Sequence, residues 1–383
     1  MFKVMWQFFL LGLYSFGGPA AHIGYFQREF VQKKWLSDQD FTHAVALCQF
    51  LPGPASSQLG MFIGYKKAGY CGAIAAFMGF TFPSFILLTF LAIGNEQYNG
   101  VAIIDTVIQA AKLLAVVVVA DALWGMFKKN ITDKLTAVVA FITSVSVFFS
   151  SGLLGQIVPI LAAALLGYLL SFRNTSASYR IVTDSIKPNW IILILFVVLL
   201  VGLPIIAHQS QLLNLFNVFY QAGSFVFGGG HVVLPLLEPM LDGMVEPGTF
   251  LSAYASAQLV PGPMFTMASY LGASVATDNP MLGSFVATIA IFLPGSLLLF
   301  AFLPAWNALF AHHKLKAAIL LVNASVVGLL ASAFIQPVIT SSIHSLLDVF
   351  VVAIEFYLLK YRQCPVWVLI TLLGAYQYIV SMM

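Results

Sequence analysis

The chain has 383 residues, of which 60% are hydrophobic and 8% are charged. Soluble globular domains carry about 25% charged residues, so this composition excludes a soluble domain and indicates a protein that lies in a lipid bilayer. The small net charge of +3 is scattered along the chain and argues against a nucleic-acid partner.

A transmembrane helix needs about 20 apolar residues, so a chain of this length has room for about a dozen spans. Apolar runs bounded by charge, glycine or proline predict about thirteen of them, which makes the fold class an all-α polytopic membrane protein. In chain order they lie near residues 4–18, 42–65, 70–93, 101–127, 135–150, 152–172, 190–207, 212–228, 249–275, 282–305, 315–339, 346–359 and 365–382. The polar stretch 171–189 is the predicted linker.

Two motifs of the first half return in the second half, which indicates an internal duplication. Phe16–Gly18 recurs as Phe227–Gly229, and Gln49–Pro54 recurs as Gln258–Pro263. A two-residue gap after the first motif brings both pairs into one register with an offset of about 210 residues. The same register pairs a histidine and a glutamate of each half, His22 with His231 and Glu29 with Glu238.

The number of spans predicts how the two halves are oriented. Each repeat holds about six predicted spans, and the apolar run 190–207 lies alone between them. A single extra crossing makes the second repeat begin on the opposite side of the membrane, so we expect inverted repeats joined by one helix. The positive-inside rule then places most of the 17 basic residues, and the N-terminus, on the cytoplasmic side of a bacterial inner membrane. The predicted units are an N-terminal repeat (1–172), a cytoplasmic linker with the inverting helix (173–211) and a C-terminal repeat (212–383).

The motifs Pro52-Gly53-Pro54 and Pro261-Gly262-Pro263 lie inside apolar runs and are expected to break the helices there. Secondary transporters with inverted repeats place the substrate near the bilayer midplane, at broken helices of this kind. We therefore predict that both breaks contribute to a substrate site. The alternative for each motif is a kink that serves helix packing alone.

The glycine runs at the end of the first span of each half are a second candidate. Their backbone N–H groups can face an anion, whereas the alternative is close packing of helices at small residues. The glycines are Gly17 and Gly18 in the first half and Gly228, Gly229 and Gly230 in the second.

Positive charge near the membrane is concentrated in the first repeat. Arg28 aligns with Leu237 in the second repeat, and its guanidinium group suits a tetrahedral oxyanion because it can donate two parallel hydrogen bonds. Arg28 is the first choice for a direct anion contact; the alternative is an exposed connecting segment that contains Arg28 and Glu29.

Lys112, inside a predicted span, is a second anion contact, or else it pairs with an aspartate such as Asp105 or Asp121.

Other polar residues near the breaks and glycine runs complete the predicted site. Glu29, Glu238, His22 and His231 are candidates for proton coupling, although each histidine can instead be a hydrogen-bonded residue of the interior. Neutral side chains close to the breaks can replace the hydration shell of an oxyanion, or bind the backbone groups that the prolines set free. These are Gln49, Ser57, Gln258 and Thr266.

In these motifs the sequence resembles the chromate ion transporter family, in its long two-domain form. The resemblance rests on Phe16–Pro19, Arg28-Glu29, Trp35-Leu36 and Leu51–Pro54, and on Phe225–His231 and Gln258–Pro263 in the second half. It implies efflux of chromate from the cytoplasm, with sulfate as a competitor of the same shape and charge and an ion gradient as the driving force.

Two other classes of function are weighed against a secondary active oxyanion transporter. A passive anion channel on the same scaffold stays open. An intramembrane enzyme is disfavoured because no HExxH or GxSxG motif is present, and no metal or cofactor is expected. A two-repeat chain can complete its own interface and can also form a homodimer.

Overall fold

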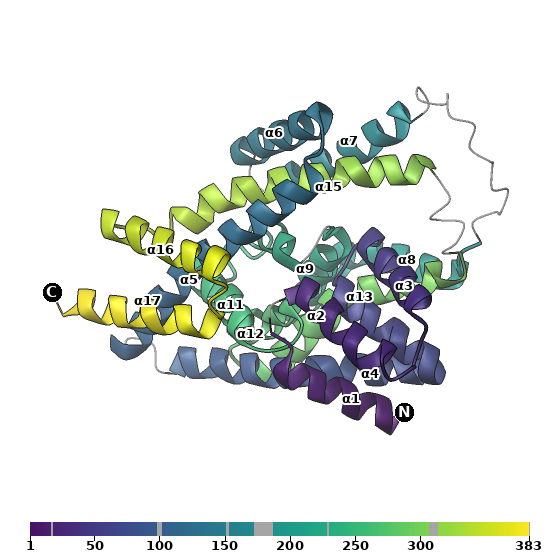
Figure 1. Ribbon diagram of the computed structural model, residues 1–383, viewed down its shortest axis with the longest axis horizontal. Helices are drawn as coiled ribbons and strands as arrows, with labels where there is room; N and C mark the ends of the chain where they lie inside the picture. Colours follow the sequence, from purple (N-terminus) through teal and green to yellow (C-terminus); the bar gives the residue numbers. More distant parts are fainter. Residues whose placement is uncertain are drawn as a thin grey trace.

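The computed structural model describes residues 1–16, 18–97, 102–150, 153–171, 187–227, 230–305 and 313–382. Within these ranges the regular elements are all helices (Figure 1). The predicted all-α fold class is therefore confirmed for the part of the chain that the structure describes.

In its described residues the first half contains seven α-helices and one π-helix, and the helix α8 (Trp190–Ile206) lies between it and the second half. The elements of the first half are α1 (Phe2–Tyr14), α2 (Gly18–Phe26), the π-helix η1 (Gln27–Val31), α3 (Asp38–Phe50), α4 (Ala55–Gln97), α5 (Ala102–Asn130), α6 (Lys134–Phe149) and α7 (Leu153–Leu170).

The second half follows the short 3-10 helix η2 (Ala207–Gln209) and repeats the same order of long and short helices. Its elements are α9 (Gln211–Phe225), η3 (Gly230–Val232), α10 (Val233–Leu237), α11 (Pro247–Leu259), η4 (Met264–Thr266), α12 (Met267–Val275), α13 (Pro280–Phe302), η5 (Leu303–Ala305), α15 (His313–Ala333), the π-helix η6 (Phe334–Ile339), α16 (Leu346–Arg362) and α17 (Val366–Ser381).

The long helix α4 is a hairpin of two arms. Its backbone leaves helical geometry at Ala68 and Gly69, and Gly69 has a φ of 61°. Gly64 and Gly72 face each other so closely across this turn that a Cβ on either would collide with the carbonyl group of the other. Gly272 of α12 and Gly283 of α13 make the same contact in the second half. Small residues thus allow a tight helical hairpin in both halves.

Among the described residues, five helical stretches are long and apolar enough to cross a membrane: Ala55–Asn95, Thr106–Asn130, Trp190–Gln209, Pro280–Ala305 and Lys314–Ile339. Shorter apolar helices lie at Phe2–Tyr14, Lys134–Phe149, Leu154–Leu170 and Val366–Val380. The count of about thirteen spans stays a prediction. The elements α2, η1 and α10 lie in stretches that were predicted as connections between spans, apart from Gly18 at the start of α2.

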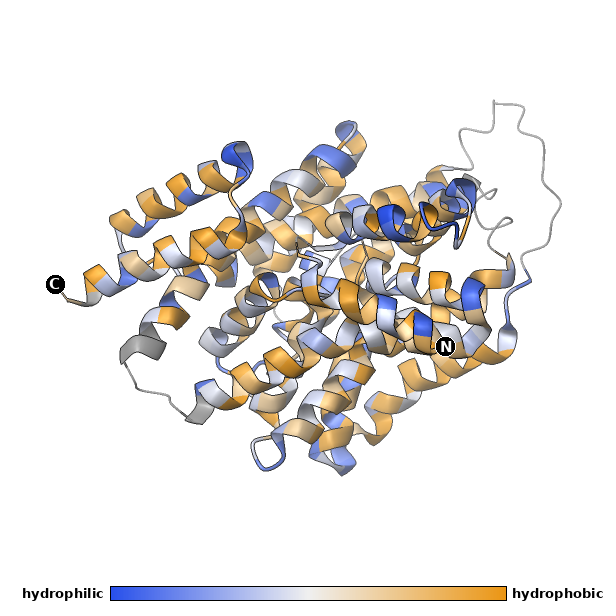
Figure 2. Ribbon diagram, turned by 60° about the horizontal axis from the view of Figure 1, so that its bottom comes forward, coloured by the Kyte–Doolittle hydropathy of each residue, from blue (hydrophilic) through white to orange (hydrophobic). Residues whose placement is uncertain are grey.

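The outer surface of the helices is apolar. In α8, Ile191, Val198 and Ile205 are exposed, and the hydropathy colouring shows apolar residues along the outward faces of the long helices (Figure 2). Large contiguous apolar surfaces on a folded chain indicate contact with lipid or with another protein. Together with the composition, this surface defines a multi-pass membrane protein.

The two halves are interleaved. The helices α6 and α7 of the first half pack against α15 of the second half, and α16 and α17 of the second half pack against α5 of the first (Figure 1). The helices α6 and α16 both begin with a capping box. Asp133 and Thr136 form it in α6, and Ser345 and Asp348 form it in α16. Each cap satisfies backbone N–H groups that a helix start leaves unpaired.

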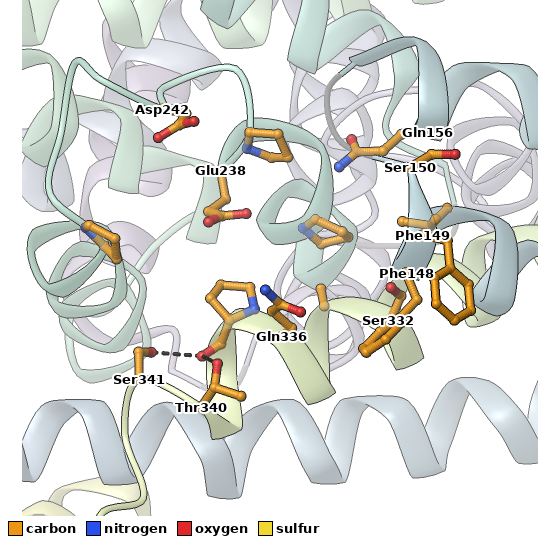
Figure 3. A pocket seen from close by; sticks show the side chains of 16 residues that line it. Phe148, Phe149, Ser150, Gln156, Glu238, Asp242, Ser332, Gln336, Thr340 and Ser341 are labelled. Atoms are coloured by element: carbon orange, nitrogen blue, oxygen red, sulfur yellow. Dashed lines mark hydrogen bonds between the residues drawn. The ribbon is translucent and has the colours of Figure 1, made fainter.

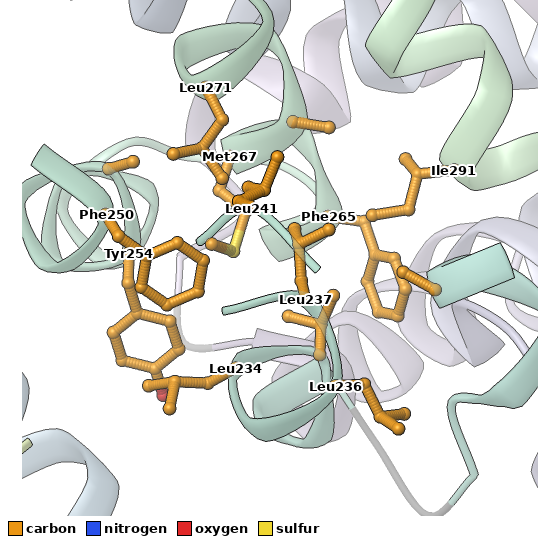
Figure 4. Packing of buried hydrophobic residues seen from close by; sticks show 14 of the residues in the cluster. Leu234, Leu236, Leu237, Leu241, Phe250, Tyr254, Phe265, Met267, Leu271 and Ile291 are labelled. Atoms are coloured by element: carbon orange, nitrogen blue, oxygen red, sulfur yellow. The ribbon is translucent and has the colours of Figure 1, made fainter. Parts of the chain in front are cut away.

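The largest apolar cluster among the described residues comes mainly from the second half, with contributions from α4, α5 and α7 of the first half, and it encloses the short helix α10 (Figure 4). All five residues of α10 are buried, and Leu234 and Leu237 pack among Tyr254 and Phe265. A smaller cluster in the first half is built on Phe8, Phe26, Phe30 and Phe80. These clusters bury all of α10, and of α2 the residues His22 and Phe26.

Candidate functional site

Each Pro-Gly-Pro motif ends one helix and begins the next, as the sequence predicts. The helix α3 ends at Phe50 and α11 ends at Leu259, immediately before the two motifs. The central glycines have nearly the same backbone conformation, with φ of 112° at Gly53 and 116° at Gly262. Residues with a Cβ rarely adopt these values, so glycine is required at the centre of both motifs.

The two breaks are hydrogen-bonded to the opposite halves of the chain. The amide of Gly53 donates to the carbonyl oxygen of Val226 at 2.8 Å, and the amide of Gly262 donates to the carbonyl oxygen of Ser15 at 3.0 Å. Val226 and Ser15 cap the C-termini of α9 and α1, just before the two glycine runs. Each break therefore contacts the first helix of the other half, and we call this arrangement the crossing.

Close packing fixes the crossing. A Cβ on Gly53 would lie 2.8 Å from the Cα of Gly295 in α13, and a Cβ on Gly262 would lie 2.8 Å from the Oγ of Ser84 in α4. Ser84 and Gly295 each follow a proline inside a helix, Pro83 or Pro294. The two breaks are therefore packed against equivalent places of the opposite halves, with no room for a larger residue.

Several polar side chains of the first half near the crossing bury a polar atom that has no hydrogen-bond partner. They are Ser15, His22, Ser57, Gln58 and Thr81, each with one unpaired polar atom. An unpaired buried polar group costs about 1–3 kcal/mol, so a cluster of them indicates a place that is built to receive a polar ligand or water. Three of these side chains carry hydroxyl groups, which can donate to an oxyanion.

Two of these side chains also bind the backbone of the crossing. The Nε2 of His22 lies 3.1 Å from the carbonyl oxygen of Ser15. Gln58 donates through its side-chain amide to the carbonyl oxygens of Pro52 and Gly295, at 2.9 Å each. Gln58 is not among the residues predicted from sequence, although its place just after the first break and inside an apolar run is a usable signal.

The matching polar groups in the second half have partners. The Nδ1 of His231 lies 2.7 Å from the hydroxyl of Tyr254, and Gln258 contacts the sulfur of Met264 at 2.6 Å. Thr266 donates to the carbonyl oxygen of Pro263. Tyr254 corresponds to Val45 in the first half, so comparing the repeats would have singled it out. The polar environment of the crossing is thus asymmetric, because the unpaired groups named above all belong to the first half of the chain.

The predicted glycine runs are described only in part. Gly17, Gly228 and Gly229 lie outside the described residues. Gly18 is half-buried with a φ of 73°, and Gly230 is buried, where a Cβ would lie 2.8 Å from the Cε of Met264. These two positions place the ends of both runs beside the crossing.

Arg28 and Glu29 lie on the π-helix η1, away from the buried part of the crossing. The Arg28 side chain is exposed and makes no hydrogen bond or ion pair with a described residue. Glu29 forms an ion pair with Lys33, which also donates to Gln7 at 3.3 Å. A direct anion contact by Arg28 stays a prediction.

Lys112 lies half-buried on α5 and points to the first turn of α11. Its Nζ would be 3.0 Å from a Cβ on Gly248. The ion pair near this region joins Asp121 of α5 to Lys360 of α16 at 2.6 Å, so Asp121 is not the partner of Lys112. The side chain of Asp105 lies outside the described residues.

The remaining predicted residues are dispersed. Gln49 is exposed on α3, and Glu238 is half-buried after α10, where burial and then the neighbouring Asp242 raise the pKa of its carboxyl group. No group of three His, Cys, Asp or Glu side chains that could hold a metal ion occurs among the described residues.

The fold and the crossing define the class of the protein, a multi-pass membrane protein built on interrupted helices. The chain belongs to the chromate transporter family, whose model matches residues 2–168 and again residues 213–378. The two matched segments lie on either side of α8.

Curated relatives cover most of the chain. An uncharacterized transporter of Methanocaldococcus jannaschii is 28% identical over 97% of this chain and 93% of its own length. A chromate transport protein of Cupriavidus metallidurans is 28% identical over 91% of this chain and 84% of its own, and a probable chromate transport protein of Synechococcus elongatus is 27% identical over 87% and 84%. No solved structure gives a significant match.

Proposed function

We propose that the protein is a secondary active transporter that moves a tetrahedral oxyanion, chromate, out of the cytoplasm. An ion gradient drives the transport or is exchanged against it. Two relatives of similar length are named as chromate transport proteins, which supports chromate as the substrate. Sulfate has the same shape and charge as chromate and is the competing substrate.

The proposed architecture is a pair of inverted repeats, 1–172 and 212–383, around the single crossing of α8, with about thirteen spans in a bacterial inner membrane and a cytoplasmic N-terminus. One family model that matches twice supports the duplication. The interleaved packing of α6 and α7 on α15, and of α16 and α17 on α5, supports two halves that complete each other.

The crossing is the observation that carries the proposal. The same contact is made in both directions, from Gly53 to Val226 and from Gly262 to Ser15. Transporters of this architecture bind their substrate where interrupted helices of the two repeats meet. A movement of one half relative to the other must break or shift both hydrogen bonds. In this proposal the crossing therefore controls access to the substrate site.

The groups around the crossing suit an oxyanion. Unpaired hydroxyl groups of Ser15 and Ser57, and the backbone of the glycine runs, supply neutral donors. In this proposal Arg28, exposed on η1, contacts the anion directly on its path, and Lys112 is a second anion contact. Further contacts are proposed at Gln49, Gln258 and Thr266, with Glu29, Glu238, His22 and His231 as sites of proton coupling.

Flux into proteoliposomes tests the proposal. Chromate, sulfate, molybdate and phosphate are compared under imposed proton and sodium gradients. A saturable chromate flux that follows an imposed gradient is expected, with competition by sulfate. A flux at the rate of a channel, indifferent to any gradient of another ion, would support a passive anion channel instead.

A further inference from the structure

One carboxyl group is buried inside the protein without a partner. Glu355 lies in the middle of α16, within a predicted span, and is only 3% exposed. Its Oε2 has no hydrogen-bond partner, and in the described part of the chain Glu355 is the only acidic residue with such an atom. Ionisable side chains inside membrane spans are rare and usually functional.

The surroundings of Glu355 are apolar. Val352 and Leu359 lie one turn before and one turn after it on the same face of α16, and both pack against an apolar cluster of α5 and α17. This cluster contains Leu113 and Leu114, which are fully buried. An ionised carboxylate is very unfavourable in such a place, because neither water nor a partner compensates its charge. While the helices are packed in this way, the carboxyl group of Glu355 therefore holds a proton.

The charged groups of α5 do not neutralise Glu355. Asp121 is paired with Lys360 at the end of α16, and Lys112 points to Gly248 of α11. Neither ion pair among the described residues includes Glu355. Other titratable groups of α5, α16 and α17 are exposed, namely Lys128, Lys129, Tyr357, Tyr361, Arg362 and Tyr378.

The nearest polar pair on α16 and α17 is complete without Glu355. The hydroxyl of Tyr376 in α17 donates to one carboxyl oxygen of Asp348 at 2.8 Å. The other oxygen of Asp348 accepts the backbone N–H of Ser345 at 2.8 Å, within the capping box. Asp348 is thus a buried carboxylate with partners, whereas Glu355 is a buried carboxyl group without them.

The equivalent position in the first half carries a neutral residue that has a partner. Thr143 lies as far from the cap residue Asp133 of α6 as Glu355 lies from the cap residue Ser345 of α16. The hydroxyl of Thr143 forms a hydrogen bond with Ser325 of α15 at 3.0 Å, and both residues are buried. The contact of α6 with α15 is therefore satisfied, whereas the contact of α16 with α5 encloses an unpaired carboxyl group.

The two halves together bury Glu355. The helices α16 and α17 belong to the second half, and α5 belongs to the first half (Figure 1). A movement of one half relative to the other therefore changes the packing around this carboxyl group. When the packing opens, water can take the proton; when it closes, the carboxyl group must take a proton back from water.

The acidic residues already proposed for proton coupling are less enclosed. Glu29 forms an ion pair with Lys33. Glu238 lines, together with Asp242, a pocket of about 760 Å³ in which water can reach its carboxyl group (Figure 3). Glu355 is not among the residues that line this pocket. A proton on Glu355 therefore exchanges with water only after the helices move, which is what coupling requires.

We propose that Glu355 binds the proton that couples anion transport to a proton gradient. The residue is protonated and neutral while α16 is packed against α5, and it returns the proton to water when this contact opens. The coupling role rests on the proposed transport of an oxyanion, whereas the proton on the buried carboxyl group does not.

Two kinds of chromate flux in proteoliposomes test the coupling role. Net flux driven by a proton gradient requires Glu355 to bind and release a proton, whereas exchange of chromate for chromate does not. Glu355→Gln keeps the shape of the protonated acid but has no proton to release. It is expected to lose the gradient-driven net flux and to keep the exchange. Net flux in Glu355→Gln equal to that of the wild type would overturn the proposal.

Two further variants complete this test. Glu246→Gln removes an exposed carboxylate at the start of α11 and is expected to keep both kinds of flux. Glu355→Asp keeps a titratable group and is expected to retain part of the net flux, with a shifted pH profile. If Glu355→Gln fails to fold, Glu355→Asp replaces it, and an unshifted pH profile would overturn the proposal.

Infrared spectroscopy tests the proton without any transport. The carbonyl stretch of a protonated carboxyl group is separate from the bands of ionised carboxylates. At neutral pH a protonated band is expected in the wild type and in Glu246→Gln, and its loss is expected in Glu355→Gln. An identical band in Glu355→Gln, or no such band in the wild type, would overturn the proposal.

The two readouts separate this proposal from the proposed function. A wild type without net chromate flux and without exchange would overturn the transport function and the coupling role, whereas the infrared band would still support a proton on Glu355. Net flux that ignores a proton gradient would overturn the proton coupling and leave the oxyanion transport intact.

Discussion

The amide of Gly262 donates a hydrogen bond to the carbonyl oxygen of Ser15, across an interval of almost 250 residues, at 3.0 Å. The same relationship joins Gly53 to Val226 at 2.8 Å. Each break is thus hydrogen-bonded to the first helix of the other half. The geometry of the crossing therefore depends on both repeats. The proposed mechanism follows from this geometry, because a substrate that binds between the halves must act on the crossing.

Gly262→Ala is expected to destabilise the protein and to reduce transport sharply. The φ of 116° is unfavourable for alanine, and the new Cβ would lie 2.8 Å from the Oγ of Ser84. Strain of this kind costs about 1–3 kcal/mol. Thermal unfolding and chromate flux per folded molecule measure both effects. Gly125→Ala is the control, since its Cβ would meet no atom within 4 Å; a loss equal to that of Gly262→Ala would contradict the account.

Gln58→Glu is expected to destabilise the protein more than Gln58→Met. The side-chain amide of Gln58 donates to the carbonyl oxygens of both Pro52 and Gly295. Methionine removes these two hydrogen bonds, each worth about 1 kcal/mol, whereas an ionised glutamate also directs negative charge at two carbonyl oxygens. Unfolding in detergent at neutral pH measures the order of the two variants. The reverse order, or no change, would show that Gln58 does not hold the break.

Asp121→Asn and Lys360→Gln are expected to show a small coupling in a double-mutant cycle. The pair joins α5 to α16 at 2.6 Å, with both side chains about one-third exposed. Partly exposed ion pairs are worth about 0.2–1 kcal/mol, and the coupling should fall as salt is added. Midpoints of thermal unfolding for the four proteins give the coupling. A value near 3 kcal/mol would mean that the pair is buried in lipid or protein rather than hydrated.

Wild-type stability in choline chloride is expected to decrease as pH rises through the titration of Glu238. Burial and the neighbouring Asp242 raise the pKa of this carboxyl group above its ordinary value of 4.5. The folded state therefore holds its proton more tightly than the unfolded state, and the resulting stabilisation is complete below pH 4.5 and is lost as pH rises through the raised pKa. Glu238→Gln should remove this part of the pH dependence. An unchanged pH profile in the variant would contradict the assignment.

Arg28→Ala is expected to raise the KM for chromate without lowering stability. The side chain is exposed and has no partner among the described residues, so its removal leaves no unpaired group. Arg28→Lys should restore part of the affinity, because lysine keeps the charge and loses the two parallel hydrogen bonds. Lys3→Ala, which removes an exposed positive charge from the start of α1, is the control. An unaltered KM in Arg28→Ala would remove Arg28 from the substrate path.

The helices and their breaks could be predicted from sequence because apolar length and proline act locally. Every predicted span contains a helix, and the runs 42–65 and 249–275 are interrupted at Pro52–Pro54 and Pro261–Pro263. The short helices α2 and α10 could not be predicted, since their burial depends on aromatic and aliphatic clusters contributed by distant segments.

Site residues could be predicted from sequence only where the residue type itself restricts the backbone conformation. Gly53 and Gly262 are required by their conformation, and the structure places both in the crossing. The position of Gln58 just after the first break is a usable signal, but its hydrogen bonds to Pro52 and Gly295 depend on how the two halves pack. The hydrogen bond from Gly262 to Ser15 depends on how the two halves pack together. Local sequence does not encode that packing.

Chromate flux through the two break variants is the most direct test of the central claim. Wild-type protein, Gly53→Ala, Gly262→Ala and the control Gly125→Ala are reconstituted at equal amounts of folded protein, with an imposed ion gradient. The account predicts gradient-driven, saturable chromate flux in the wild type and in Gly125→Ala, and loss of flux in both break variants. Undiminished flux through folded Gly53→Ala and Gly262→Ala would contradict it.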